Sequence, residues 1–319
     1  MHISFQNHIS LTTPALLALT LLQAIPILAA SAGCGQPPSL INGVNSIAVN
    51  GRVRNYMLQL PKNYDPNHPH RVVFTFHPMG ATMSDIASGS LVEEGVWAYF
   101  GLQRKATAAT AKSTSTASPC SPGSSSCSKE TTNNSTSTIF VAPQGLNNAW
   151  RNQVNEDIIF ITHLLAALES SLCIDPTLHF ATGFSFGGAM TYSIACSLDF
   201  RAVAVLSGGA ISGCEGGTRP VSYLGVHGVR DRSLPITAGR AMRDRFVRNN
   251  GCEAGDALEP AAGSLTHIKT SYKGCAAGRQ VVWIAFDGGH NPAPVDGSLE
   301  RSGSSYVVDE TWAFFEQFG

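Results

Sequence analysis

Residues 179–188 decide the fold, and they read His179-Phe180-Ala181-Thr182-Gly183-Phe184-Ser185-Phe186-Gly187-Gly188. The first four residues are typical of a buried strand, and residues 187–197 have the composition of a helix. Between them lies the pattern Gly-x-Ser-x-Gly, in which a strained turn from strand to helix pushes the serine side chain out of the sheet. The flanking glycines lack side chains, so neighbouring backbone can come close. The stretch therefore predicts a nucleophilic serine at the end of a strand.

The rest of the chain alternates between short apolar runs and amphipathic stretches. In residues 157–172, Ile158, Ile161, Leu165 and Leu168 recur at helical spacing. Buried strands that alternate with such helices favour a mostly parallel central sheet with helices on both faces, as in the α/β-hydrolase fold. The predicted strands are 46–49, 56–60, 72–76, 138–142, 179–182, 202–206, 221–226, 267–270 and 281–286, and the predicted helices are 157–172, 187–197, 238–249 and 309–318.

The composition excludes several classes of protein. Of the 319 residues, 43% are hydrophobic and 13% are charged, which is too apolar for a disordered chain and too polar for a protein with many membrane spans. The 21 Lys and Arg residues face 22 Asp and Glu residues, so there is no basic excess to neutralise phosphates. We therefore expect neither nucleic acid nor a membrane as a partner of the mature protein.

The first 32 residues have the pattern of a secretory signal peptide. Residues 14–30 form an apolar run that is short for a membrane span, and Ala30 and Ala32 are small residues that suit cleavage after Ala32. An uncleaved anchor is the alternative, because the leading residues contain no Lys or Arg. We expect residues 1–32 to be removed and residues 33–319 to form a single secreted, extracellular domain.

All eight cysteines follow residue 32, and an even number in an exported chain indicates disulfides. Their spacing favours two local pairs, Cys120–Cys127 and Cys252–Cys275. No cysteine or histidine cluster has metal-ligand spacing, so we expect no metal site, and nothing in the sequence calls for an organic cofactor. Three pairings remain open for the other four cysteines, which are Cys34, Cys173, Cys196 and Cys214.

Residues 105–138 differ sharply in composition from the rest of the chain. Of these 34 residues, 18 are Ser or Thr, and none is Val, Ile, Leu, Met or aromatic. Such a segment buries too little apolar area to offset the entropy lost on ordering. We predict a surface insertion, with overlapping glycosylation sequons at Asn133 and Asn134.

Serine requires a base to remove its proton and an acid to orient that base. In this fold the residues follow the order Ser, Asp or Glu, His, each after a strand. Asp231 follows the predicted strand 221–226, and His290 follows the predicted strand 281–286. We therefore predict that Ser185, Asp231 and His290 form a catalytic triad.

Three other residues compete for these roles. Asp287 precedes His290 in the same turn, and we interpret it as a cap of that turn. His267 lies in an alternating strand and is interpreted as a solvent-facing residue. His227 precedes a glycine at a strand end, and we interpret it as a packed structural histidine near the site.

An oxyanion hole needs two backbone N–H groups aimed at the developing negative charge. The residue after the nucleophile, Phe186, provides one at the positive end of a helix. The loop after strand 72–76 provides the other, and because Pro78 has no N–H we choose Met79, with Gly80 as second choice.

Several longer motifs extend these predictions to a family. From Cys34 to Phe318 the chain resembles the secreted fungal feruloyl esterases of carbohydrate esterase family 1, which are related to polyhydroxybutyrate depolymerases. The resemblance implies a serine carboxylic-ester hydrolase that releases ferulic acid from feruloylated plant cell-wall polysaccharides or oligosaccharides. The matching stretches are Tyr64-Asp65-Pro66, Phe74-Thr75-Phe76-His77, Tyr99-Phe100-Gly101-Leu102, residues 142–150 from Ala142 to Trp150, Glu156-Asp157-Ile158, residues 183–188, residues 202–205, His227-Gly228 with Asp231, and residues 287–290.

The substrate pocket is less closely defined by the sequence. An aromatic acyl group needs an apolar slot, and Trp150 lies in a Gly/Asn-rich loop where its ring could form one wall. A ring buried in the core is the competing interpretation. An acetylxylan esterase or a polyester depolymerase would use the same triad, and a non-catalytic cell-wall binding protein is the alternative from another class.

Overall fold

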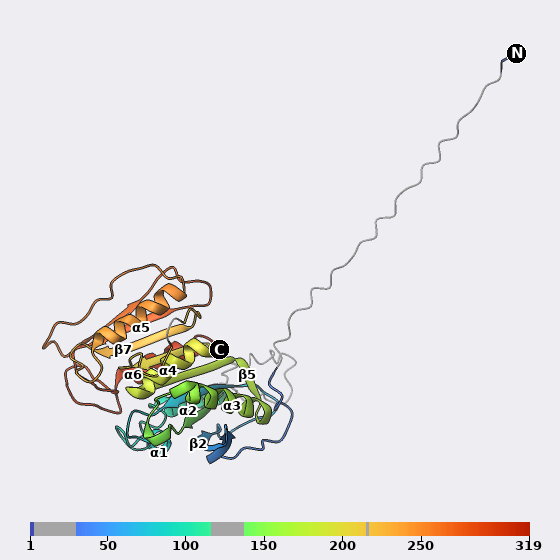
Figure 1. Ribbon diagram of the computed structural model, residues 1–319, viewed down its shortest axis with the longest axis horizontal. Helices are drawn as coiled ribbons and strands as arrows, with labels where there is room; N and C mark the ends of the chain where they lie inside the picture. Colours follow the sequence, from blue (N-terminus) through green and yellow to red (C-terminus); the bar gives the residue numbers. More distant parts are fainter. Residues whose placement is uncertain (3–29, 116–136, 215–216) are drawn as a thin grey trace, which may run out of the picture.

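The computed structural model describes residues 1–2, 30–115, 137–214 and 217–319. Within these residues one sheet of nine strands runs through the molecule in the order β1-β2-β4-β3-β5-β6-β7-β9-β8 (Figure 1). Strands β4, β3, β5, β6, β7 and β9 are parallel, whereas β1 and β2 at one edge and β8 at the other are antiparallel to their neighbours. The strands are β1 (Gly43–Val49), β2 (Arg52–Gln59), β3 (His70–Phe76), β4 (Thr138–Pro143), β5 (Ile174–Phe184), β6 (Ala202–Leu206), β7 (Ser222–Gly228), β8 (His267–Ser271) and β9 (Val281–Phe286).

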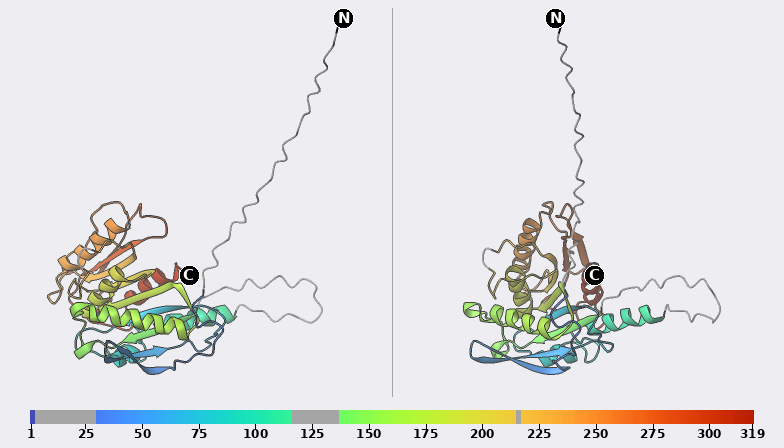
Figure 2. Two further views of the ribbon diagram at one scale, coloured as in Figure 1. Left: turned by 45° about the vertical axis from the view of Figure 1, so that its right-hand side comes forward. Right: turned by 90° about the vertical axis from the view of Figure 1, so that its right-hand side faces the viewer.

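Helices cover both faces of this sheet, which confirms the predicted α/β-hydrolase architecture. In the right-hand view of Figure 2, the orange α5 lies on the opposite side of the sheet from the red α6. No helix among the described residues is long and apolar enough to cross a bilayer. The helices are α1 (Met83–Ser88), α2 (Leu102–Ser115), α3 (Glu156–Ser171), α4 (Phe186–Ser197), α5 (Ile236–Asn249) and α6 (Tyr306–Glu316), with short 3-10 turns at Leu146–Asn148 and Gln153–Asn155.

The two faces of the sheet have separate apolar clusters. Within β3, Val72 and Phe74 face the cluster shared with α3, α4 and α5, whereas Val73 faces the cluster shared with α1, α2 and α6. Alternate residues of a strand point to opposite faces. A strand that is buried on both faces therefore needs apolar residues at consecutive positions, as the sequence of β3 has.

The segment 105–138, predicted as a surface insertion with too little apolar area to become ordered, begins as a helix, because α2 continues to Ser115. This segment is rich in alanine, a strong helix former, and Ala106 and Ala109 pack against the cluster on the α6 face. Lys105 also forms an ion pair with Asp309 of α6. The short alanine side chains of α2 therefore provide the packing against the α6 face, although the segment contains no larger apolar residue.

Strand β5 is longer than predicted, and its sequence pattern explains the difference. The polar Asp175 and Thr177, with Pro176 between them, break the apolar run near its start. The pairing with β3 is irregular at the same point, shifting between the partners of His70 and Val72. The strand therefore begins at Ile174 and continues through a break that conceals it in the sequence.

Three disulfides lie among the described residues. The predicted pair Cys252–Cys275 is confirmed. Of the three pairings left open for the other four cysteines, the structure has Cys34–Cys173 and Cys196–Cys214. The remaining predictions for Cys120–Cys127 and for Asn133 and Asn134 lie outside the described residues, as does most of the predicted signal peptide.

The chain just before the predicted cleavage point is built into the domain. The Ser31 N–H donates to Ile174 O at 3.1 Å, and the Ser31 hydroxyl donates to Leu172 O at 2.6 Å. The Ile174 N–H in turn donates to the Ser31 hydroxyl at 2.8 Å. Cleavage after Ala32 therefore remains a prediction, and it would remove a residue that makes three hydrogen bonds with Leu172 and Ile174.

Candidate active site

The turn between β5 and α4 has the strain that the Gly-x-Ser-x-Gly pattern predicted. Ser185 has φ 58° and ψ −120°, a conformation that side chains other than glycine rarely adopt. A Cβ on Gly187 would overlap the Phe76 carbonyl, and a Cβ on Gly183 would overlap the Gly187 carbonyl. Both positions therefore require glycine, and together they hold Ser185 at the carboxyl end of β5.

The structure brings together the three residues predicted as a triad. His290 Nε2 lies 2.8 Å from Ser185 Oγ, and His290 Nδ1 lies 2.7 Å from Asp231 Oδ2. Ser185 follows β5, Asp231 follows β7 and His290 follows β9, so the carboxyl ends of three parallel strands bring the side chains to one edge. The Phe184 ring packs against the imidazole at a centroid distance of 4.5 Å.

The surroundings of Asp231 determine which nitrogen of His290 carries the proton. Burial raises the pKa of Asp231, but hydrogen bonds from His290 and from the Leu234 N–H outweigh burial and hold that pKa below its ordinary value. Asp231 is therefore ionised near neutral pH and can only accept hydrogen bonds. In a neutral imidazole the proton is consequently on Nδ1, and Nε2 is free to accept the Ser185 hydroxyl.

None of the three competing residues joins the triad, and only His227 has the role that the sequence predicted. The Asp287 carboxylate contacts other segments instead of capping its own turn. The His267 side chain is only 23% exposed, with its ring stacked on Tyr306 at 3.8 Å, so it does not face solvent as predicted. Asp287 pairs with Arg230 at 2.8 Å and accepts the Leu265 N–H at 2.9 Å, so it braces the turn that carries His290. His227 is buried, and its Nε2 donates to the Leu234 carbonyl at 2.7 Å. His267 lies on β8 and contacts Asp296 at 2.9 Å.

Two backbone N–H groups near Ser185 remain candidates for an oxyanion hole. Phe186 is the first residue of α4, where backbone N–H groups have no acceptor within the helix. In the loop after β3, the Gly80 N–H donates to the Asn148 carbonyl at 2.8 Å, which removes Gly80 from consideration. Met79 keeps its place as the predicted second donor.

The loop that carries Met79 is held by His77, a residue for which the sequence predicts no separate role. The Gly145 N–H donates to His77 Nε2 at 3.0 Å, so the proton of this imidazole is on Nδ1 and donates to the Pro78 carbonyl at 2.8 Å. Burial lowers the pKa of His77, which favours this neutral form. The signal for this residue was its position at the end of β3, within the motif Phe74-Thr75-Phe76-His77.

Trp150 is buried in the core, as in the competing interpretation, and not exposed as the predicted wall of an acyl slot. The side chain is fully buried, and its ring packs edge-on against Phe76 at 5.2 Å. Its Nε1–H donates to the His77 carbonyl at 2.9 Å. The indole therefore supports the loop of Met79 from below, because an aromatic side chain in a loop gains more from burial than from exposure.

An open cavity of about 460 Å³ lies directly beside the triad. Its lining residues belong to the segment after β9, and they include His290 itself. Among the described residues no group of three or more His, Cys, Asp or Glu side chains could hold a metal ion.

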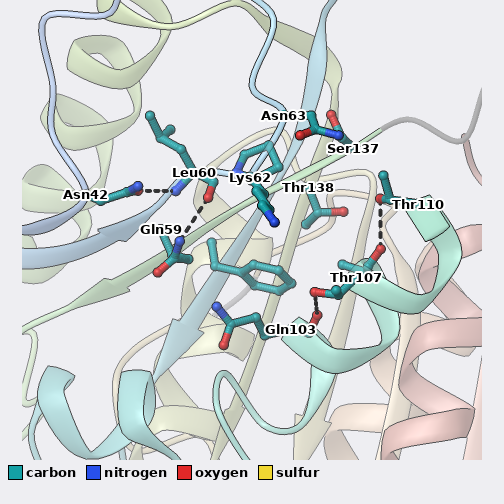
Figure 3. A pocket seen from close by; sticks show the side chains of 13 residues that line it. Asn42, Gln59, Leu60, Lys62, Asn63, Gln103, Thr107, Thr110, Ser137 and Thr138 are labelled. Atoms are coloured by element: carbon teal, nitrogen blue, oxygen red, sulfur yellow. Dashed lines mark hydrogen bonds between the residues drawn. The ribbon is translucent and has the colours of Figure 1, made fainter. Parts of the chain in front are cut away.

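A larger cavity, of about 690 Å³, is lined by none of the triad residues. Figure 3 shows the side chains that line it. It is lined by residues of β2, α2 and β4, including Gln59, Gln103 and Thr138. Thr138 is the first residue of β4, so this cavity lies at the amino end of a strand, whereas the triad lies beyond the carboxyl ends. We therefore do not assign it to the reaction of Ser185.

Solved structures share the fold at low sequence identity. An acetyl xylan esterase from Aspergillus awamori has a TM-score of 0.52 and 14% identity, with 87% of this chain and all of that chain (100%) covered. A CE1 ferulic acid esterase from Anaeromyces mucronatus, solved in complex with ferulic acid, has a TM-score of 0.51 and 13% identity, with 88% of this chain and 91% of that chain covered. These likenesses concern the fold.

Sequence relatives are much closer, although no protein-family model matches the chain. A feruloyl esterase D from Neurospora crassa is 40% identical over 316 residues, which cover 98% of this chain and 98% of that protein. A feruloyl esterase C from Emericella nidulans is 41% identical over 287 residues, which cover 89% of this chain and 90% of that protein. With this identity along nearly the whole chain, the protein belongs to the family of fungal feruloyl esterases, which are carboxylic-ester hydrolases.

Proposed function

We propose that this protein is a secreted serine esterase that hydrolyses feruloyl esters of plant cell-wall polysaccharides and releases ferulic acid. The observation that carries the proposal is the continuous chain of hydrogen bonds from Ser185 through His290 to Asp231. The names of the close relatives point to the feruloyl group. The three disulfides of the described residues support an oxidising compartment outside the cytosol.

The first half of the proposed reaction forms an acyl-enzyme. Ser185 Oγ attacks the ester carbonyl carbon while His290 Nε2 takes the hydroxyl proton, and Asp231 stabilises the imidazolium that results. The carbonyl oxygen becomes negative and accepts hydrogen bonds from the N–H groups of Phe186 and Met79. When the tetrahedral intermediate collapses, the bond to the alcohol oxygen breaks, and His290 gives its proton to that oxygen.

The second half repeats these steps with water. His290 Nε2 takes a proton from a water molecule, whose oxygen attacks the carbonyl of the ferulate ester on Ser185. The bond to Ser185 Oγ then breaks, and His290 returns the proton to the serine. The products are ferulic acid and the free enzyme, so each turnover consumes one water and needs no cofactor.

The decisive experiment compares the wild-type protein with Ser185→Ala on methyl ferulate, acetylated xylan and polyhydroxybutyrate. We expect turnover of methyl ferulate by the wild type and none above background by the variant, because no other side chain occupies the nucleophile position. Circular dichroism and thermal unfolding check that the variant is folded. Wild-type preference for acetylated xylan or for polyhydroxybutyrate would instead indicate an acetylxylan esterase or a polyester depolymerase.

A further inference from the structure

The cavity beside His290 has no assigned ligand. Its walls are residues 289–292, in the turn after β9, and residues 299–301, which return to the same place. In the proposed reaction, a cavity next to His290 contacts one of the two halves of the ester, the alcohol or the acyl group.

The proton transfers of the reaction determine whether this half is the alcohol or the acyl group. His290 Nε2 must return its proton to the oxygen of the departing alcohol, so that oxygen has to lie within hydrogen-bond reach of Nε2. The carbonyl oxygen turns instead toward the N–H groups of Phe186 and Met79. The alcohol part of the ester therefore extends along the His290 side of the site, where the cavity lies.

Both walls of the cavity are held in place by hydrogen bonds of the loop itself. Asn291 Nδ2 donates to the Glu300 carbonyl at 3.2 Å, and Asn291 Oδ1 accepts the Ala293 N–H at 2.9 Å. Pro294 and Arg301 form an isolated antiparallel bridge between the two arms. Arg301 Nη1 also donates to the Leu91 carbonyl at 3.0 Å, which ties the arm to a neighbouring segment. The cavity is thus defined before any substrate arrives.

The side chains that remain available suit a sugar. Leu299 is 59% exposed although it is apolar, so it can contact the C–H face of a sugar ring. The exposed Glu300 carboxylate makes no hydrogen bond or ion pair among the described residues, and a carboxylate accepts hydrogen bonds from neighbouring hydroxyls. The remaining N–H groups of Arg301 can donate to hydroxyl oxygens.

We propose that the cavity formed by residues 289–292 and 299–301 is the subsite for the sugar that carries the ester, with Leu299 and Glu300 as its specificity-determining residues. The inference rests on the proposed function, and it adds that the enzyme recognises the alcohol as well as the acyl group. In this arrangement the sugar contacts the cavity and the ferulate does not, so changes in the cavity should affect only esters that carry a sugar.

The test uses two substrates that share ferulate and differ in the alcohol, methyl ferulate and a feruloylated arabinose. For the double variant Leu299→Ala/Glu300→Gln we expect kcat/KM on the sugar ester to fall about tenfold, mainly through a higher KM. On methyl ferulate the same variant should stay within about twofold of wild type, because methanol is too small to reach Leu299 and Glu300.

The matched control is Leu258→Ala/Glu253→Gln. Leu258 and Glu253 are also an exposed apolar and an exposed acidic side chain, but they do not line the cavity. This variant should behave as wild type on both esters. A second readout that is independent of turnover is calorimetric binding of the feruloylated arabinose to Ser185→Ala, with and without the two cavity substitutions.

Three results would overturn the inference: an equal loss on both esters, which would assign the cavity to the acyl group; no loss on either ester; or unchanged binding in the Ser185→Ala background. A wild-type protein that cannot cleave methyl ferulate counts against the proposed function alone, because the binding measurement still reports on the cavity.

Discussion

His77 Nε2 accepts the backbone N–H of Gly145 at 3.0 Å, and this contact joins the loop after β3 to the loop after β4. The Trp150 Nε1–H donates to the His77 carbonyl at 2.9 Å, and the Gly80 N–H donates to the Asn148 carbonyl at 2.8 Å. These three hydrogen bonds join the two loops at His77 and Gly80, on either side of Met79 in the chain. An N–H group that stabilises a transition state has to be held in advance, since its reorientation would otherwise cost part of the gain.

Trp150→Phe should therefore reduce activity although Trp150 touches no substrate. The substitution keeps an aromatic ring but leaves the His77 carbonyl without its donor, so we expect the Met79 loop to loosen and kcat on methyl ferulate to fall about tenfold. Thermal unfolding should show a loss of about 1 kcal/mol. Trp97→Phe is the control, because the Trp97 side chain is also buried and its N–H has no partner among the residues that the structure describes. Equal kcat values for the two variants would contradict the supporting role of Trp150.

Asp231→Asn should lower kcat about 10³- to 10⁴-fold with little change in KM, because an amide can donate to Nδ1 and so favours the wrong imidazole tautomer. Steady-state kinetics on methyl ferulate measure this effect. Asp287→Asn provides the comparison, since Asp287 is equally buried but pairs with Arg230 and not with His290. We expect Asp287→Asn to lower the free energy of unfolding more than it lowers kcat. A larger loss of kcat in Asp287→Asn than in Asp231→Asn would show that Asp287, and not Asp231, orients His290.

The stability of the protein should decrease on mild acidification. Burial lowers the pKa of His70, His77 and His227 below the ordinary value of 6.5. As the pH falls below 6.5, the unfolded chain takes up protons at these positions before the folded protein does, so the free energy of unfolding decreases. Asp231 affects stability in a different pH range, because its pKa in the folded protein lies below the ordinary value of 3.8. Its contribution to the free energy of unfolding is present above pH 3.8 and is lost only as the pH falls through the lower folded pKa.

Urea denaturation at pH 7.5 and pH 5.5 measures this effect. We expect the decrease in unfolding free energy between the two pH values to be smaller in His227→Gln than in wild type by about 1 kcal/mol. His163→Gln is the control, because His163 is exposed on α3 and its substitution should leave the pH dependence unchanged. A wild-type protein equally stable at both pH values would contradict the assignment of these histidines as buried and neutral.

A chain that begins at Ser31 should be more stable than one that begins at Gly33. The longer chain keeps the three hydrogen bonds between Ser31 and residues 172–174, which together contribute about 2 kcal/mol. Chemical denaturation of the two purified chains measures the difference. Ser31→Ala in the longer chain removes only the hydroxyl, which makes two of the three hydrogen bonds, so this variant should lose about two thirds of the effect. Equal stability of both chains would show that the Ser31 contacts contribute nothing.

The triad was predictable because each of its members follows a recognisable strand. The pattern around Ser185 is local, and Asp231 and His290 come directly after apolar runs. Parallel strands have their carboxyl ends at the same edge of the sheet, so the order of residues in the chain implies their meeting in space. Helix α1 is absent from the predicted helices, although the capping box between Thr82 and Asp85 is a local signal for it.

The amino-acid sequence by itself determined the elbow at Ser185, the alternation of strands and helices, and the residue types that meet in the triad. Only the tertiary structure decided that Trp150 is buried, that Lys105–Ser115 continues a helix, and that Cys34 pairs with Cys173. The physical reason is the range of the interactions. Strand and turn patterns arise between neighbours in the chain, whereas burial and disulfide pairing depend on distant segments that come together only when the sheet has formed.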